Sequence, residues 1–118
     1  MQSPLPNKGP VLVASDLSDG ADEAVRQAYA WAVSAKRALH AIVVIPGTMR
    51  MNPLFPQLNQ QDTTEFVSAE RDAAERLAER VEYCIGGASD AVQIDVDFGD
   101  GYAVIVRKAE EIGASLIV

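Results

Sequence analysis

The residue types that could do chemistry gather in two short stretches, and the first surrounds Asp16. Asp16 belongs to residues 15–20 (SDLSDG), which follow the apolar run 11–14 (VLVA) and precede a helical pattern. In open α/β sheets, ligands bind at the carboxyl ends of the strands, and helix N-termini favour anions. The stretch therefore suggests a nucleotide site, although it suggests no reaction. Asp16 either points into the crevice at the strand ends or caps the following helix, and the sequence leaves both roles open.

The second stretch, residues 99–104 (GDGYAV), nearly matches the dinucleotide-binding fingerprint because it follows a strand pattern and opens a helix. Val104 replaces the third glycine, which would permit a close helix–strand approach. The stretch also follows a predicted edge strand, away from the point between strands one and four where the strand order reverses. Asp95, Asp97 and Asp100 resemble a calcium loop, but two of the loop's ligand positions hold residues that do not chelate. We therefore interpret these acids as the solvated side of an edge strand and expect no metal.

The single histidine and the single cysteine add no recognisable site. His40 has no second histidine or cysteine near it in the sequence, so we interpret it as a strand-end residue. Cys84 is interpreted as a small residue near a helix end. One cysteine excludes an intrachain disulfide and suits a reducing compartment, which favours a cytoplasmic protein.

Length and charge limit the classes of function. The 118 residues are enough for one domain, predicted to span residues 10–118 after a disordered tail at residues 1–9. The formal net charge of −7 argues against nucleic-acid binding, which needs clustered lysine and arginine. No apolar run approaches the roughly 20 residues of a membrane span, so we expect no membrane association.

Apolar periodicity predicts four strands that alternate with helices. Three runs, at residues 11–14, 39–45 and 115–118, are almost entirely apolar, as expected of parallel strands buried on both faces. The run 92–98 instead alternates apolar residues with acids and an amide, which is typical of a sheet edge. This β-α-β-α-β-α-β pattern predicts a three-layer α/β/α fold with a doubly wound parallel sheet and strand order 3-2-1-4.

Helical spacing and capping signals predict the three helices between these strands. The first is predicted over residues 21–36, with Asp19 as its N-cap and an acid three residues later completing a weak capping box. The second is predicted to begin at a capping box headed by Asp62, and its charged face, which includes Arg80, is interpreted as solvated. The third follows the second acidic stretch and ends at Gly113.

Residues 46–61 (PGTMRMNPLFPQLNQQ) are unusual because sixteen residues are long for a connection between a strand and a helix. Their proline, asparagine and glutamine content argues against regular structure, whereas their methionine, leucine and phenylalanine side chains are apolar. Two interpretations stay open: a lid or docking surface for a protein partner, and a mobile insertion.

Three segments in this order resemble the universal stress protein family: VLVASDLSDGADEAV from residue 11, LHAIVVIP from residue 39 and FGDGYAVIVRKAEEIGASLIV from residue 98. The resemblance implies a flavodoxin-like fold of the adenine-nucleotide-binding type, which is usually dimeric and in many members binds ATP. The positions that match the family's adenosine pocket are Ala14, Ser15, Asp16 and Val44. Gly101 stands where a proline is common in the family. The family's glycine-rich phosphate loop follows strand four and is not among these residues, so we expect a further loop, helix and fifth strand after Val118.

These observations favour a stress-response regulatory domain that binds ATP at the ends of strands one and four and is not an enzyme, with weak hydrolysis left open. The alternative is a nucleotide-free interaction or dimerisation module that contacts a protein partner through residues 46–61. Strand four would leave an apolar edge exposed, so either the chain continues into the further strand, which we favour, or a second subunit covers this edge. A homodimer joined along the sheet edge is the assembly we expect once the further strand is present.

Overall fold

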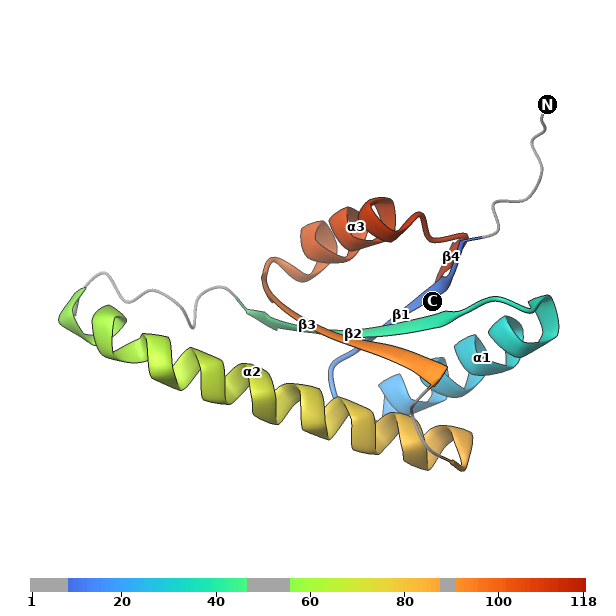
Figure 1. Cartoon of the computed structure of the whole chain (residues 1–118), viewed down its shortest axis with the longest axis horizontal. Coiled ribbons are helices and arrows are strands. Elements are labelled where there is room, and N and C mark those ends of the chain that lie inside the picture. Colours follow the sequence, from blue (N-terminus) through green and yellow to red (C-terminus); the bar gives the residue numbers. More distant parts are fainter. Residues whose placement is uncertain (1–8, 47–55, 88–90) are drawn as a thin grey trace.

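The computed structural model describes residues 9–46, 56–87 and 91–118, with side chains in the second segment described from residue 68. Strands and helices alternate along the described chain, as the sequence predicts (Figure 1). The elements are β1 (Val11–Ser15), α1 (Asp19–Ala35), β2 (Leu39–Pro46), α2 (Pro56–Ile85), β3 (Val92–Gly99), α3 (Gly101–Ile112) and β4 (Leu116–Ile117).

The four strands form one sheet in the order β3-β2-β1-β4, and every pairing is parallel. The predicted strand order is confirmed, and so is the assignment of β3 to an edge. Figure 1 shows α1 and α2 on one side of the sheet and α3 on the other. The arrangement is therefore the predicted three-layer α/β/α fold.

The larger core lies between the sheet and the helices α1 and α2. Alternate residues of β1, β2 and β3 point to this face, since successive side chains of a strand face opposite sides. The buried members of the cluster are Val11, Val13, Leu39, Ala41, Val43 and Val92 from the sheet, Val25, Ala28 and Ala32 from α1, and Ala73, Leu77 and Val81 from α2.

The opposite face of the sheet has a smaller core beneath α3. Leu12 and Ile42 are fully buried there against Val104 of α3. Half-buried Ile105, Ala109 and Ile112 of α3 complete the helix face that covers this core.

The acidic side chains of β3 do not simply solvate the sheet edge, because α3 covers them. Asp95 lies 3.6 Å from Lys108 Nζ and 3.6 Å from His40 Nδ1, and its side chain is only 22% exposed. Asp97 pairs with Arg107 of α3 at 3.1 Å. The interpretation of these acids as a wet strand face is thus wrong for Asp95, whose charge is balanced inside the α3 face instead.

The second helix begins earlier than the sequence predicts. α2 starts at Pro56 rather than at Asp62, so residues 56–61 of the predicted irregular segment are helical. Proline is well accommodated at the first position of a helix, where its missing N–H has no partner to lose. Residues 47–55 lie outside the described residues. Within the described residues, no helix combines the length and apolar character needed to cross a membrane.

The start of the domain is tied to the connection before β4. The Ser115 hydroxyl donates to the Gly9 carbonyl at 2.8 Å, and the Ser115 amide donates to the Pro10 carbonyl at 2.9 Å. Gly9 therefore belongs to the folded domain and not to the predicted tail, the rest of which, residues 1–8, lies outside the described residues.

Candidate functional site

A cavity of about 510 Å³ lies at the carboxyl ends of β1 and β2. We call it the strand-end cavity. All four residues proposed from the sequence line it: Ala14, Ser15, Asp16 and Val44. Its volume is within the range of small-molecule sites. The sequence predicts a nucleotide site at the ends of strands one and four, whereas the strand residues that line this cavity come from β1 and β2.

Five further lining residues come from the N-terminal turns of two helices. Ser18, Gly20 and Ala21 border the cavity from the start of α1, and Gly101 and Ile105 border it from α3. Residues 99–104 follow the edge strand β3, as predicted, yet Gly101 borders this cavity because the crossover after β3 brings the start of α3 over the ends of β1 and β2. The alternation of strands and helices could have predicted this position, because each helix in such a fold begins at the carboxyl edge of the sheet.

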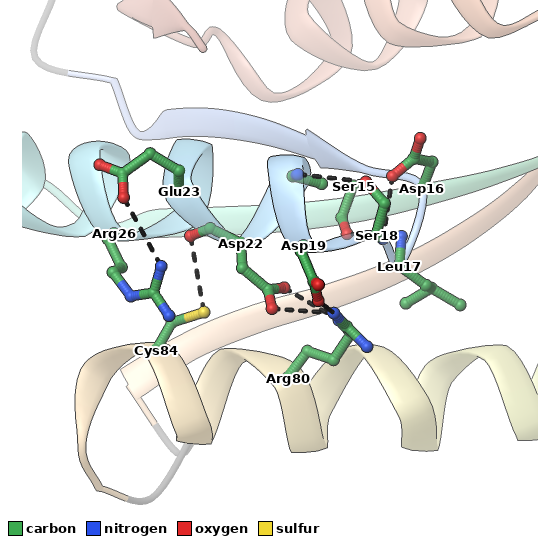
Figure 2. A network of polar contacts seen from close by, with 11 residues as sticks. Ser15, Asp16, Leu17, Ser18, Asp19, Asp22, Glu23, Arg26, Arg80 and Cys84 are labelled. Atoms are coloured by element: carbon green, nitrogen blue, oxygen red, sulfur yellow. Dashed lines mark hydrogen bonds and ion pairs between the residues drawn. The ribbon is translucent and has the colours of Figure 1, made fainter.

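The turn between β1 and α1 is held by its own side chains (Figure 2). Ser15 Oγ accepts the Leu17 amide at 3.0 Å, and Asp16 Oδ1 accepts the Ser18 amide at 3.0 Å. Leu17 has φ 67°, a left-handed conformation that is uncommon for a bulky residue and marks local strain. The half-buried Leu17 side chain packs against the α1/α2 core, which offsets that strain.

Ser18, not Asp19, is the N-cap of α1. Its backbone is extended, and its hydroxyl accepts the Ala21 amide at 3.2 Å. The predicted cap was one residue late, because two neighbouring positions hold good capping side chains and only their backbone angles distinguish them. Asp19 is the first helical residue, where its charge complements the helix dipole.

Asp16 lines the cavity without capping the helix. Hydrogen bonds from the Ser18 side chain and then its backbone lower the pKa of the Asp16 carboxyl below its ordinary value, and the charge of Arg80 lowers it further. Asp16 is thus an exposed carboxylate at the cavity wall, ionised at neutral pH. Its bond to Ser18 fixes the turn in front of the helix that Ser18 caps.

Arg80 of α2 reaches across to the first turn of α1 (Figure 2). Its Nε donates to Asp22 Oδ1 at 2.9 Å, and its Nη2 donates to Asp22 Oδ2 at 2.9 Å and to Asp19 Oδ1 at 3.0 Å. The Asp22 side chain is 8% exposed, so this fork of hydrogen bonds compensates a buried charge. The prediction that Arg80 belongs to a solvated face is therefore wrong.

Cys84 lies beside the same pair of helices. Its thiol donates to the Asp22 carbonyl at 3.6 Å, and burial, followed by the Asp22 charge, raises the pKa of the thiol. Cys84 therefore lies at the interface between α1 and α2, which agrees with its interpretation as a small residue near a helix end.

The second acidic stretch has a structural explanation at the start of α3. Gly99 has φ 138°, and a Cβ there would lie 3.0 Å from Val104 Cγ2, so glycine suits both the backbone and the helix contact. Asp100 caps α3 by accepting the amides of Tyr102 and Ala103. Within the described ranges 9–46, 56–87 and 91–118, no cluster of side chains could hold a metal ion.

The comparison with known families decides which fold family this is. The sequence profile of the universal stress protein family matches residues 9–118. The chain belongs to the universal stress protein family. Solved structures of this family share the fold of the chain. A universal stress protein UspA from Lactobacillus plantarum is 18% identical, with a TM-score of 0.66 over 95% of this chain and 76% of that protein.

Two further solved structures give the same result. A universal stress protein from Burkholderia pseudomallei is 26% identical, with a TM-score of 0.65 over 93% of this chain and 79% of that protein. A universal stress protein in complex with cAMP is 17% identical, with a TM-score of 0.55 over 92% of this chain and 69% of that protein. No curated protein is significantly similar to the chain in sequence.

Proposed function

We propose that the strand-end cavity binds an adenine nucleotide, such as ATP or AMP, and that this universal stress protein acts as a binding module and not as an enzyme. The observation that carries the proposal is the convergence of Ala14, Ser15, Asp16 and Val44 with two helix N-termini on one cavity. The cAMP complex of a protein with the same fold supports a nucleotide as the ligand class.

The cavity walls suit the parts of a nucleotide. Ala14, Val44 and Ile105 offer apolar surface on which a purine ring can lie. Asp16 keeps acceptor capacity after its bond to Ser18, because an ionised carboxylate has about four lone-pair sites. We assign that capacity to the hydroxyls of the ribose.

The phosphate is assigned to the mouth of the cavity, next to the helix N-termini. The helix dipole favours an anion at such a position, although Ser18 and Asp100 already accept the amides of Ala21, Tyr102 and Ala103. α1 and α3 have 17 and 12 residues, so each is long enough to carry a helix dipole at its start.

The experiment is isothermal titration of adenosine, AMP and ATP into the full chain, with phosphate release measured in parallel. We expect one ligand per chain and no sustained phosphate release. Asp16→Asn should lower the affinity for adenosine about tenfold, because a hydrogen bond to a charged acceptor contributes about 1.5–3 kcal/mol. The control Asp72→Asn makes the same charge change on the exposed face of α2 and should leave the affinity unchanged. Absence of binding of all three ligands would refute the proposal.

The rival proposal is a nucleotide-free interaction or dimerisation module. Its surface would include the segment after β2, of which residues 47–55 lie outside the described residues. A homodimer remains a prediction, and light scattering of the full chain measures it. A dimer that forms equally well with and without AMP, in a chain that binds no nucleotide, would favour this rival.

A further inference from the structure

The first turn of α1 carries an excess of negative charge next to the strand-end cavity. Asp16, Asp19 and Asp22 lie within seven residues, and Ser18, Gly20 and Ala21 between them line the cavity. A phosphate placed at this helix N-terminus would lie in the electrostatic field of three carboxylates, namely Asp16, which lines the cavity, and Asp19 and Asp22 at the start of α1. Their repulsion opposes the attraction of the helix dipole, so the balance of charge here decides whether an anion can bind.

Arg80 is the cation that opposes these carboxylates. It pairs with Asp22 through two hydrogen bonds of 2.9 Å and with Asp19 at 3.0 Å. Asp19 and Asp22, which Arg80 contacts, directly flank the cavity-lining residues Gly20 and Ala21 in α1. Figure 2 shows the Arg80 side chain extending from α2 toward Asp19 and Asp22 of α1.

We infer that Arg80 is a specificity-determining residue that lets the strand-end cavity accept an anionic nucleotide in preference to the neutral nucleoside. It acts through Asp19 and Asp22, whose charges it balances, and it needs no contact with the ligand. The inference rests on the proposed function, because it concerns the same cavity.

A purely structural role for Arg80 makes a different prediction. The bonds of Arg80 to Asp19 and Asp22, which we call the Arg80 clamp, join α1 to α2. The clamp therefore also positions the cavity-lining start of α1. If Arg80 only positioned the start of α1, the loss of Arg80 would weaken the binding of adenosine and of AMP by the same factor. Balancing of charge instead changes the ratio of the two affinities, because only AMP carries the phosphate.

The test compares the dissociation constants of adenosine and AMP for the full chain at low ionic strength. Arg80→Gln should raise the ratio of the AMP constant to the adenosine constant about fivefold, as expected for one unit charge acting across a partly solvated distance. Added salt should remove most of this difference. The control Arg76→Gln removes the same charge one turn earlier on the exposed face of α2 and should leave the ratio unchanged.

Three companion variants keep the test decisive if Arg80→Gln does not fold, because that variant leaves the buried Asp22 without its cation. Arg80→Lys keeps the charge and should keep the wild-type ratio. The double variant Arg80→Gln with Asp22→Asn removes one charge of each sign and should also keep it. Asp19→Asn, at an exposed position, should lower the ratio about threefold.

The outcomes separate this inference from the proposed function. If wild-type protein binds neither adenosine nor AMP, the proposed function fails and the inference fails with it. If wild-type protein binds both, but Asp19→Asn and every folded Arg80 variant keep the wild-type ratio, the inference alone fails. An equal change in Arg76→Gln and Arg80→Gln would also overturn it, because net charge and not the clamp would then set the ratio.

Discussion

The two faces of the sheet differ in how completely the described helices cover them. On the α1/α2 face, twelve buried residues form one cluster, whereas three form the cluster beneath α3. The strand-end cavity takes its apolar walls, Ala14, Val44 and Ile105, from the α3 face. The comparison indicates that the α1/α2 face supplies most of the stability, while the other face supplies the apolar walls of the strand-end cavity.

A second cavity among the described residues differs from the strand-end cavity in a related way. The strand-end cavity is bordered by helix N-termini, whereas a groove of about 460 Å³ runs between α2 and the edge strand β3. This α2–β3 groove is lined by Glu70, Arg71, Ala74, Ile94, Asp95 and Val96. No helix begins there among its described lining residues, so the groove lacks the dipole that makes the strand-end cavity attractive to an anion.

The largest expected effect is the loss of stability when each face is truncated by the same amount. Leu77→Ala on α2 should lower the free energy of unfolding by about 3 kcal/mol, because Leu77 is fully buried and a cavity remains. Ile112→Ala on α3 should lower it by only about 1 kcal/mol, because Ile112 is half-buried. Urea unfolding measures both values. Equal losses would show that the two faces are equally important for stability.

The next effect compares an ion pair on each side of the sheet. Arg80→Gln should lower Tm by several degrees, because it leaves the buried Asp22 carboxylate without a cation. Arg107→Gln breaks the exposed pair with Asp97 and should shift Tm by less than about 2 °C. Differential scanning calorimetry at neutral pH checks the pair. A larger decrease in Tm from Arg107→Gln than from Arg80→Gln would show that the ion pair on the α3 side contributes more to stability than the one on the α1/α2 side.

The thiol of Cys84 reports on how closed the α1/α2 interface is. Because burial and the Asp22 charge raise its pKa, the native protein should react with a disulfide reagent at least about tenfold more slowly than free cysteine. The same protein unfolded in urea serves as the control and should react at the rate of free cysteine. A native rate equal to the unfolded rate would mean that the helix interface opens readily.

The smallest effect is the acid dependence contributed by Asp16. Its pKa is lower in the folded protein than in the unfolded chain, so it stabilises the fold above about pH 4. That contribution is lost as the pH falls through the lowered pKa. The Tm difference between wild type and Asp16→Asn should therefore shrink from about pH 5 to about pH 2. A difference that stays constant over this range would argue against the Ser18–Asp16 bonds as its source.

The strand order and the four cavity residues could be predicted because they depend on short patterns. Each apolar run fixes a strand, and the family resemblance places Ala14, Ser15, Asp16 and Val44 at strand ends. Their convergence follows from the parallel order, which brings the carboxyl ends of β1 and β2 to one edge.

The Arg80 clamp could not be predicted, because it depends on how two helices pack. Arg80 and Asp22 are 58 residues apart, and each looks like an ordinary surface charge in its own helix. The left-handed backbone of Leu17 could not be predicted for a similar reason, because it is stabilised by the core that the Leu17 side chain joins. Long-range packing thus decided the features that local patterns missed.

The most direct test of nucleotide binding at the strand-end cavity is a titration of the isotope-labelled full chain with AMP, followed by amide chemical shifts. We predict saturable shifts at Ala14, Asp16, Gly20 and Gly101, which border the strand-end cavity. Ala74 and Val96 of the α2–β3 groove should stay unchanged. The absence of saturable shifts, or shifts confined to the groove, would contradict the assignment of the nucleotide to the ends of β1 and β2.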